Sequence, residues 1–393
     1  MSPATSPHDA PRRSSRAAPV IVAARRTPIG TSGRSLSSVS AADLAAPVLG
    51  ALAADVPGIG VREVVLGNCT GPGGDVARVA ALAAGLPVEV PALTVDRQCG
   101  SGLAAIEVAV AMLAAAPGLI LAGGVESAST APWRFRPPTQ GEVGGEPRRY
   151  DRAPFAPPSF EDPEMGESAD LLAEERGVTR SRQDAYAARS HARAATTRDA
   201  GGFIEEIVPV AGVVTDERIR AGLTASRLSR LRPAFRPTGT VTAGNACGIN
   251  DAAAAVAVVD AATHRDLGIP GLRVLATASA GVHPGRPGIG LVPAVRQALQ
   301  LAGVSLADVD VVELNEAFAG QVLACCDELG LDPERVCPEG GALALGHPWG
   351  ASGAVLAVRL FTQLVRHGGG DLGLAAIAVG GGQGVAMVVQ RCR

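Results

Sequence analysis

Two segments of the chain hold side chains that can do covalent chemistry together. Cys99 stands in DRQCGSG, between an apolar strand and a helix of small residues. A helix N-terminus favours the thiolate form, and the flanking glycines let a substrate approach the backbone. His347 stands in ALGHPWGAS, in a loop where a base can lie. The alternatives are a small buried hydrophobe and a loop histidine without a role.

A third segment, VVELNEAF, places Asn315 and Glu316 after an apolar strand. These residues can orient a base or a water, or they can simply cap a helix. A cysteine, a histidine and an asparagine together are typical of an activated thiol with an oxyanion site. A further cluster joins Arg220 to the loop GTVTAGNACGIND, where the guanidinium can meet a phosphate. A loop with a solvated arginine explains that cluster equally well.

Composition excludes several other kinds of chemistry. The 393 residues include no lysine and carry a net charge of -3, so neither a lysine Schiff base nor a basic nucleic-acid surface is expected. Seven cysteines without C-x-x-C spacing argue against a zinc site and a disulfide framework, and predict reduced thiols. We find no apolar run of the roughly 20 residues that a membrane span needs. These features predict a cytoplasmic protein without a metal or nucleic-acid partner.

Alternating apolar strands and helices predict an α/β fold. CGSGLAAIEVAVAMLAAAPGLILAGG and WGASGAVLAVRLFTQLVRHGGGDLGLAAIAVGGG both run from a small-residue turn through an apolar helix to a strand with glycines. This similarity predicts a duplicated α/β unit whose two turns face one shared site. In AIAVGGGQGVAMVV, three glycines interrupt an apparent strand pair, which indicates close approach of a ligand or another backbone.

The composition also predicts where the parts of the chain begin and end. An Arg- and Ser-containing stretch without the order of a secretory signal predicts a disordered tail at 1–18, with a transit peptide as the alternative. A first half is expected over 19–270 and a second over 271–393. The Pro/Gly/Arg-rich middle, at about 126–250, predicts a long excursion with a functional role rather than a part of the core.

From about residue 19 onward, the chain resembles the thiolase family in seven ordered segments. They are DRQCGSGLAAI, GGVESAS, MGESADLLAE with SRQDAYAARSHARA, GTVTAGNACGIND, NEAF, GGALALGHPWGASGA and VGGGQGVAMVV. The resemblance implies a thiolase fold, with two duplicated five-layered α/β halves and an inserted loop domain. It also implies a coenzyme A thioester as substrate, no permanently bound cofactor, and a homodimer or homotetramer.

The resemblance assigns roles to the candidate residues. Cys99 would be acylated, with His347 as its activating base. His347 and a water held by Asn315 would form one oxyanion hole, and the backbone N–H groups of Cys99 and Gly380 the other. A side chain at Gly380 would then block the thioester oxygen. The residues that would bind substrate and coenzyme A are Met165, Arg220, Ala246, Cys247 and Phe318.

One departure from the family concerns the second catalytic cysteine, which removes or returns an α-proton. Thiolases usually place it in C-x-G-G-G, where this chain has Ala378. One branch of the family moves it to the position after the acid of NEAF, which here is Ala317. Four more residues differ from those that are usual in the family, and we expect them around the same site: Glu164, Cys247, Pro287 and Glu339.

Three hypotheses follow from these departures. In the first, the enzyme forms acyl-Cys99 but is impaired in condensing two acyl-CoAs, and passes the acyl group to an unknown acceptor. In the second, it is an ordinary acetyl-CoA C-acyltransferase in which another base, such as Cys247, Glu164 or a water, replaces the missing cysteine. In the third, the chain is a non-catalytic coenzyme A-binding subunit.

Overall fold

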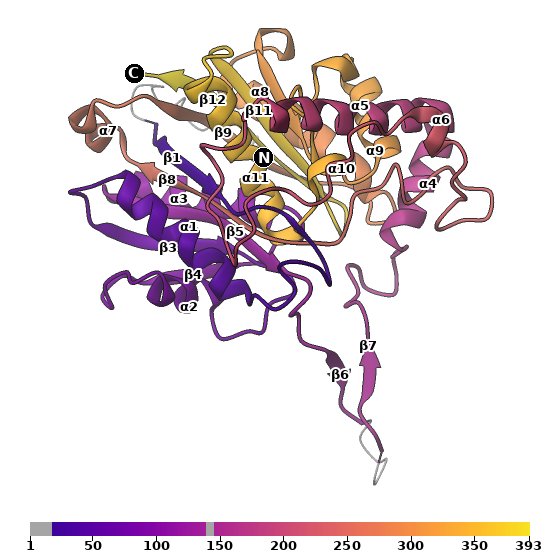
Figure 1. Ribbon diagram of the computed structural model, residues 1–393, viewed down its shortest axis with the longest axis horizontal. Coiled ribbons are helices and arrows are strands. Elements are labelled where there is room, and N and C mark those ends of the chain that lie inside the picture. The colour runs from indigo at the N-terminus through magenta and orange to yellow at the C-terminus, as the bar shows by residue number, and fades with distance from the viewer. Residues whose placement is uncertain (1–17, 139–144) are drawn as a thin grey trace, which may run out of the picture.

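The computed structural model describes residues 18–138 and 145–393, so the tail predicted at 1–18 lies almost wholly outside the described residues. Ten strands form one mixed sheet in the order β10-β11-β12-β9-β1-β8-β5-β3-β4, with β2 paired to β8 (Figure 1). Their bounds are β1 Val20–Arg26, β2 Gly30–Thr31, β3 Val61–Gly67, β4 Ala92–Val95, β5 Leu119–Ser127, β8 Asn250–Val259, β9 Gly271–Gly281, β10 Val311–Leu314, β11 Leu372–Val379 and β12 Gln383–Cys392.

The same run of strand pairings occurs twice in this sheet. In the first half, β3 and β5 are parallel, and β8 pairs antiparallel with both β5 and β1. In the second half, β10 and β11 are parallel, and β12 pairs antiparallel with both β11 and β9. The halves join where β1 pairs with β9. This repetition agrees with the duplication that the two matching stretches of sequence indicate.

The helices form an inner pair and two outer groups. The inner helices α3 (Ser101–Ala115) and α11 (Trp349–Phe361) contact each other and strands of both halves. On the outer sides, α1 (Ala41–Asp55) and α2 (Val76–Ala83) cover the first half, and α8 (Leu291–Ala302), with α9 (Ala319–Leu329) beside it, covers the second. Three apolar cores fill the spaces between these layers. The molecule therefore has five α/β layers, which the two halves build together.

The close approach of the inner helices depends on glycine. A Cβ atom on Gly102 would lie 2.8 Å from the carbonyl oxygen of Gly350, and one on Gly353 would lie 2.5 Å from the amide nitrogen of Leu103. The stretch Gln98–Ala115, which contains α3, is long and apolar enough to cross a membrane by length and composition, and half of it is buried in the fold. Its place between the two halves of the sheet accounts for that composition.

The segments between β5 and β8 lie beside the second half. A hairpin of β6 (Arg134–Arg136) and β7 (Arg148–Tyr150) projects away from the body of the molecule (Figure 1). Next, α4 (Met165–Glu175) and α5 (Arg180–Asp199) pack on α9, and α5 also packs on α10 (Ala342–Leu345). The remaining helical segments are α6 Ala225–Leu228, α7 Ala261–Leu267, η2 Pro287–Ile289, η3 Leu306–Asp308, η4 Pro333–Arg335 and the π-turn η5 Thr362–Arg366.

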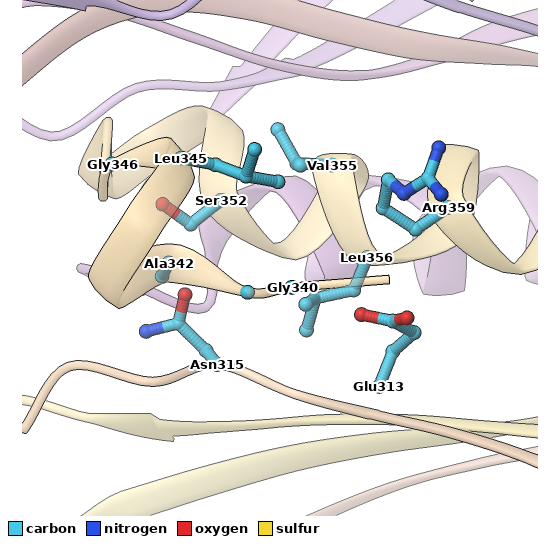
Figure 2. Close-up of a pocket in the computed structure, with 11 residues that line it drawn as sticks. Glu313, Asn315, Gly340, Ala342, Leu345, Gly346, Ser352, Val355, Leu356 and Arg359 are labelled. Carbon is cyan, nitrogen blue, oxygen red and sulfur yellow. The ribbon is translucent and has the colours of Figure 1, made fainter. Parts of the chain in front are cut away.

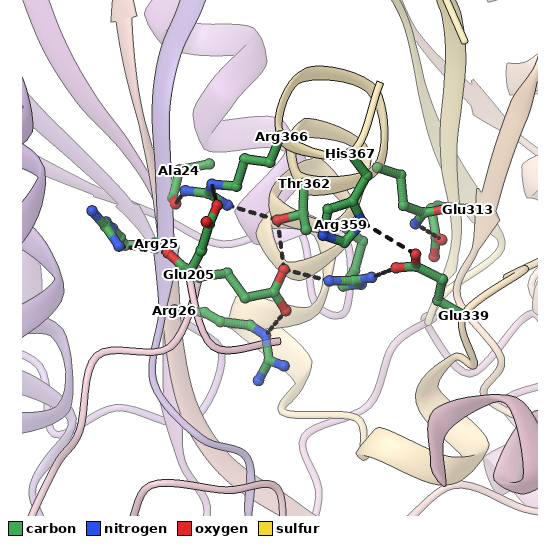
Figure 3. Close-up of polar contacts among 12 residues, drawn as sticks. Ala24, Arg25, Arg26, Glu205, Glu313, Glu339, Arg359, Thr362, Arg366 and His367 are labelled. Carbon is green, nitrogen blue, oxygen red and sulfur yellow. Dashed lines mark hydrogen bonds and ion pairs between the residues drawn. The ribbon is translucent and has the colours of Figure 1, made fainter. Parts of the chain in front are cut away.

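A buried ionic cluster ties β1, the inserted region and α11 together (Figure 3). Arg26 donates to Glu206 and to Asp216, both at 2.7 Å, and Arg359 donates to the second oxygen of Glu206. Burial alone would raise the pKa of Glu206, but the charges of Arg359 and Arg26 lower it. The guanidiniums of Arg26 and Arg359 also lie 5.4 Å and 4.7 Å from the ring centre of Phe203.

Replacing Glu206 with alanine should destabilise the fold by about 3–5 kcal/mol, because Arg359 would lose a carboxylate partner in a buried place. The change is measured by calorimetric or denaturant unfolding. The matched control is Glu205→Ala: this neighbouring carboxylate is 71% exposed and lies 3.8 Å from Arg366. Its loss should cost less than about 1 kcal/mol. Equal effects of the two substitutions would contradict the role of the buried cluster.

Candidate active site

Cys99 lies in the turn that joins β4 to α3, as its sequence neighbours indicate. The preceding Gln98 has φ +45°, a left-handed conformation that costs a residue other than glycine about 1–3 kcal/mol. Ser101 fixes the turn, because its hydroxyl accepts a hydrogen bond from Arg97 N at 2.8 Å and donates one to Gln98 O at 2.6 Å. The fold therefore constrains the backbone that carries the thiol.

His347 lies in the equivalent turn of the second half, between α10 and α11. Its peptide N–H donates to Asn250 Oδ1 at 2.9 Å. In the ring, Nδ1 lies 2.6 Å from Ser352 Oγ and Nε2 lies 3.5 Å from Asn315 Nδ2. When the Nδ1–H donates to Ser352, Nε2 keeps the lone pair that a base needs.

The NEAF segment is anchored by its glutamate. Asn315 directly follows β10, and its N–H donates to Ala376 O at 2.9 Å. Glu316 is fully buried and accepts hydrogen bonds from Tyr186 at 2.8 Å, from Ser190 at 2.7 Å and from Leu343 N at 3.1 Å. Burial raises the pKa of Glu316. Glu316 thus ties α5 and α10 to the loop that presents Asn315.

The three glycines form the turn between β11 and β12. Gly381 and Gly382 have φ +82° and +79°, and a Cβ on Gly382 would lie 2.4 Å from Val282 O. A Cβ on Gly380 would lie 2.9 Å from the ring of Phe155, so a side chain there would also have to displace this ring. The backbone of Gly380 hydrogen-bonds the Cys99 thiol and favours its thiolate.

These segments surround a pocket of about 90 Å³. Predicted residues in its wall are Cys99, Met165, Cys247, Pro287, Ala317, Phe318, His347 and Ala378. The sequence reasoning missed other wall residues, namely Ser168, Ala169, Gly288, Gln321, Trp349 and Val379. Of these, Ser168, Ala169, Trp349 and Val379 stand within recognised motifs, which is the signal that could have identified them.

Cys247 stands beside the NEAF loop. Its N–H donates to Ala317 O at 2.9 Å, and the next contacts in this short ladder join Ala246 to Phe318 and Asn245 to Ala319. This pairing sets the backbone of Cys247 beside Ala317, the position after the acid of NEAF, and both residues line the same pocket as Ala378. Ala246 is buried and packs with Phe318, but it does not line the pocket.

Arg218, which the sequence reasoning did not single out, lies near Cys247 and its charge acts on the Cys247 thiol. The guanidinium of Arg218 donates to Ala246 O at 2.9 Å and to Leu343 O at 3.2 Å. Arg220 is exposed and lies outside the pocket wall, with its backbone N–H donating to His191 Nδ1 at 3.2 Å.

Two of the expected departures lie away from the pocket, which corrects the prediction that all five surround it. Glu164 has a 69% exposed side chain that pairs with Arg152 at 3.2 Å. Glu339 pairs with Arg359 and lies 3.3 Å from His367 Nδ1 (Figure 3). The pocket wall therefore contains Ala378, Cys247 and Pro287, but neither of these carboxylates.

Burial holds the reactive side chains neutral. It raises the pKa of Cys99 to about 11, against the hydrogen bond from Gly380, and lowers the pKa of His347 to about 4. It raises the pKa of Cys247 to about 12, against the positive charge of Arg218. At neutral pH the resting site thus holds thiols and a neutral imidazole, so the imidazole can accept the proton of Cys99 when the sulfur attacks.

The raised pKa of Cys99 predicts the pH dependence of its alkylation. The thiolate is the form that reacts with iodoacetamide. The alkylation rate at Cys99 should therefore still increase with pH above pH 9, where the rate for a thiol of ordinary pKa levels off. Peptide mass spectrometry at a series of pH values measures the rate at Cys99. A plateau below pH 8 would contradict the effect of burial.

Comparisons with known proteins agree with this geometry. Residues 19–262 match the thiolase N-terminal domain and residues 270–391 the thiolase C-terminal domain. The chain is 44% identical over 390 residues to an acetyl-CoA acetyltransferase of Pseudomonas aeruginosa, covering 95% of this chain and 99% of that protein. It is also 44% identical to a beta-ketoadipyl-CoA thiolase of the same organism, covering 93% and 97%.

A solved structure gives the same result. The crystal structure of the Bacillus anthracis acetyl-CoA acetyltransferase superposes with a TM-score of 0.87 at 37% identity, covering 96% of this chain and all of that one. The family matches span both halves of the sheet, and the similarity extends through the whole fold. The chain therefore belongs to the thiolase family and is an acyltransferase of thiolase type.

Proposed function

We propose that the chain is an ordinary acetyl-CoA C-acyltransferase in which Cys99 carries the acyl group and Cys247 replaces the missing acid/base cysteine. The observation that supports this most directly is the convergence of Cys99, His347 and Cys247 on one pocket. The relatives named acetyl-CoA acetyltransferase and beta-ketoadipyl-CoA thiolase favour this reaction over one impaired by Ala378. No observation favours a non-catalytic coenzyme A-binding subunit.

The first half-reaction acylates Cys99. The sulfur of Cys99 attacks the thioester carbonyl while His347 Nε2 takes its proton, and coenzyme A leaves as its sulfur receives that proton. The backbone N–H groups of Cys99 and Gly380 stabilise the oxyanion of this step. In the second half-reaction, His347, while its Nε2 carries a proton, and a water held by Asn315 stabilise the oxygen of the second acyl-CoA. Each such donor is worth about a hundredfold or more in rate.

The second half-reaction needs a group that removes an α-proton, and Cys247 lines the same pocket as Cys99 and His347. Cys247 first passes its own proton to the neutral His347, and its thiolate then takes the proton from the second acyl-CoA. The resulting carbanion attacks the carbonyl of acyl-Cys99, and the Cys99 sulfur leaves as it receives the proton from His347. In cleavage, the same thiol returns the proton to the leaving carbanion. Two observations support this role: the backbone of Cys247 pairs with Ala317 at 2.9 Å, and the charge of Arg218 partly offsets the burial that raises the pKa of the Cys247 thiol. Glu164, another candidate, is exposed and paired with Arg152.

The same proposal covers substrate binding and assembly. Met165, Ala246 and Phe318 would border the thioester and pantetheine, and the exposed Arg220 would meet a phosphate of coenzyme A. The coenzyme A thioester would be the substrate, without a permanently bound cofactor. We propose a homodimer or homotetramer in the cytoplasm, with the inserted loop domain at about 126–250 carrying the coenzyme A contacts.

The test is the thiolytic cleavage of acetoacetyl-CoA by coenzyme A. The wild-type enzyme should form acetyl-CoA with a turnover on the order of 1–10³ per second. The control is intact-mass detection of the acetyl adduct after mixing with acetyl-CoA alone. An adduct without cleavage would restore the impaired enzyme as the better account, and no adduct with any short acyl-CoA would overturn both.

A further inference from the structure

A cavity of about 300 Å³ lies at the junction of the two halves of the sheet, where β1 and β9 begin and β12 ends. Its wall consists of Val20, Ala261, His264, Arg265, Arg273 and Arg393. Three of these six residues are arginines, and they come from helix α7, from strand β9 and from the position after β12. Figure 1 shows α7 and the end of β12 on the same side of the molecule. The fold thus gathers positive charge from distant parts of the sequence.

The described part of the chain places no carboxylate in the wall of this cavity. Among the described residues, the side chains of Arg265, Arg273 and Arg393 have no hydrogen-bond or ion-pair partner, and the Nε atom of Arg273 is also buried. Asp260, at the start of α7, accepts a hydrogen bond from Thr263 Oγ1 at 2.6 Å, so it caps its own helix. A partly buried guanidinium without a counter-charge is unfavourable, and a bound anion would supply that charge.

Other arginines have carboxylate partners within the fold. The buried Arg359 binds Glu206, and Figure 2 shows Arg359 and Glu313 lining the same small interior space. Arg391, near the end of β12, pairs with Asp371 at 3.0 Å. The three arginines of the cavity differ from these in that their N–H donors remain available to a ligand.

We propose that this cavity binds a small anion that carries two linked phosphate groups, at a site separate from the acyl pocket. Each guanidinium presents a planar fork of N–H donors that matches two phosphate oxygens. The three arginines carry three positive charges, and two linked phosphates carry about three negative charges at neutral pH. None of the described wall residues is Phe, Tyr or Trp, so recognition rests on the phosphates and not on stacking of a base.

The backbone holds one of these arginines in place before a ligand binds. Arg273 lies in the middle of the sheet, where it pairs with Val20 of β1 and with Gln390 of β12. Arg265 and Arg393 are exposed at the rim of the cavity. The bound anion would therefore rest on a fixed guanidinium and be covered by two arginines that can adjust to it.

The sequence favours an external ligand over a segment of the chain itself. Residues 1–17, which precede the described part, contain three arginines and one aspartate. This segment therefore carries positive charge and cannot neutralise the cavity. The whole chain has a net charge of -3, so the positive charge is local, and a long nucleic acid is not the expected ligand.

The cavity and the acyl pocket lie at opposite ends of the same pair of strands. Near the turn of Gly380, Gln383 of β12 pairs with Gly281 of β9, and near the cavity Cys392 pairs with Gly271. The ten residues of β12 span roughly 30 Å at about 3.3 Å per residue. A ligand in the cavity would therefore not touch Cys99.

The test is calorimetric titration of the full chain with pyrophosphate at low ionic strength, where charge interactions are least screened. Wild type should bind pyrophosphate, and Arg265→Gln and Arg393→Gln should each weaken binding about tenfold or more. Both side chains are exposed, so these variants should fold normally. Arg391→Gln is the matched control, because Arg391 lies outside the cavity wall, and it should bind like wild type. No binding by wild type, or equal losses in Arg391→Gln and Arg265→Gln, would overturn the proposal.

Two further titrations define the ligand and the place where it binds. Inorganic phosphate should bind at least about tenfold more weakly than pyrophosphate, and ADP should bind about as well, because its two phosphates offer the same oxygens. Equal affinity for phosphate, or binding of ADP alone, would overturn the assignment to two linked phosphates. Arg220→Gln, at the proposed coenzyme A contact, should still bind pyrophosphate. If Arg220→Gln loses binding while Arg265→Gln retains it, the anion occupies the coenzyme A site and the separate site is refuted.

Discussion

Cys99→Ala should lower acetoacetyl-CoA cleavage by at least about 10⁴-fold, because without the sulfur no covalent acyl intermediate forms. The acetyl adduct seen by intact-mass spectrometry should vanish in the same variant. Binding of coenzyme A, measured by calorimetry, should persist, since the other wall residues of the pocket are unchanged.

Cys69→Ala is the matched control for this substitution. The Cys69 sulfur lies 3.7 Å from Ser101 Oγ, in the neighbourhood of the same turn, but Cys69 is absent from the pocket wall. The adduct and the cleavage rate should both survive its loss. An adduct that persists in Cys99→Ala and is lost in Cys69→Ala would reverse the assignment of the nucleophile.

The second large effect is expected at Cys247. Cys247→Ala should lower acetoacetyl-CoA cleavage by about 10²- to 10⁴-fold, the range of a lost general acid or base. The acetyl adduct on Cys99 should form at the wild-type rate, because His347 alone serves that step. A variant that loses cleavage and acylation together would show that Cys247 does no more than shape the pocket.

A second variant separates proton transfer from packing at this position. Cys247→Ala combined with Ala378→Cys returns a thiol to the usual place of the acid/base in the family, in the wall of the same pocket. The double variant should recover a substantial part of the lost cleavage. The single variant Cys247→Ser serves as the comparison. If the double variant regains cleavage and Cys247→Ser does not cleave, proton transfer needs a thiol, and either position can hold it.

The features that sequence could predict are those with local causes. The Ser40 side chain caps α1 by accepting from Asp43 N at 3.2 Å, as the residue type and spacing indicate. The apolar pattern and the small residues of the two inner helices predict their burial and the repeated unit. Cys99 and His347 were identified because each lies in the turn before such a helix, where glycine and proline mark the boundary.

The features that the sequence did not predict depend on contacts between distant segments. Cys247 and Ala317 lie 70 positions apart in loops without periodic signal, so their pairing comes from the packing of the inserted region against the second half. Glu339 was assigned to the acyl pocket because of its neighbours in sequence, whereas Arg359 draws it into the buried ionic cluster. Arg218, which donates to Ala246 O, could not be singled out because a loop without periodic signal gives no rule for which side chain turns toward a pocket.

The most direct measurement of the central claim is exchange of the α-protons of acetyl-CoA with deuterium oxide, followed by mass spectrometry. Wild type should incorporate deuterium into the methyl group, because the Cys247 thiolate removes an α-proton and returns a deuteron. Cys247→Ala should show no exchange above the uncatalysed rate while it still forms acetyl-Cys99. Exchange at the wild-type rate in Cys247→Ala would contradict the account and assign the proton transfer to another group.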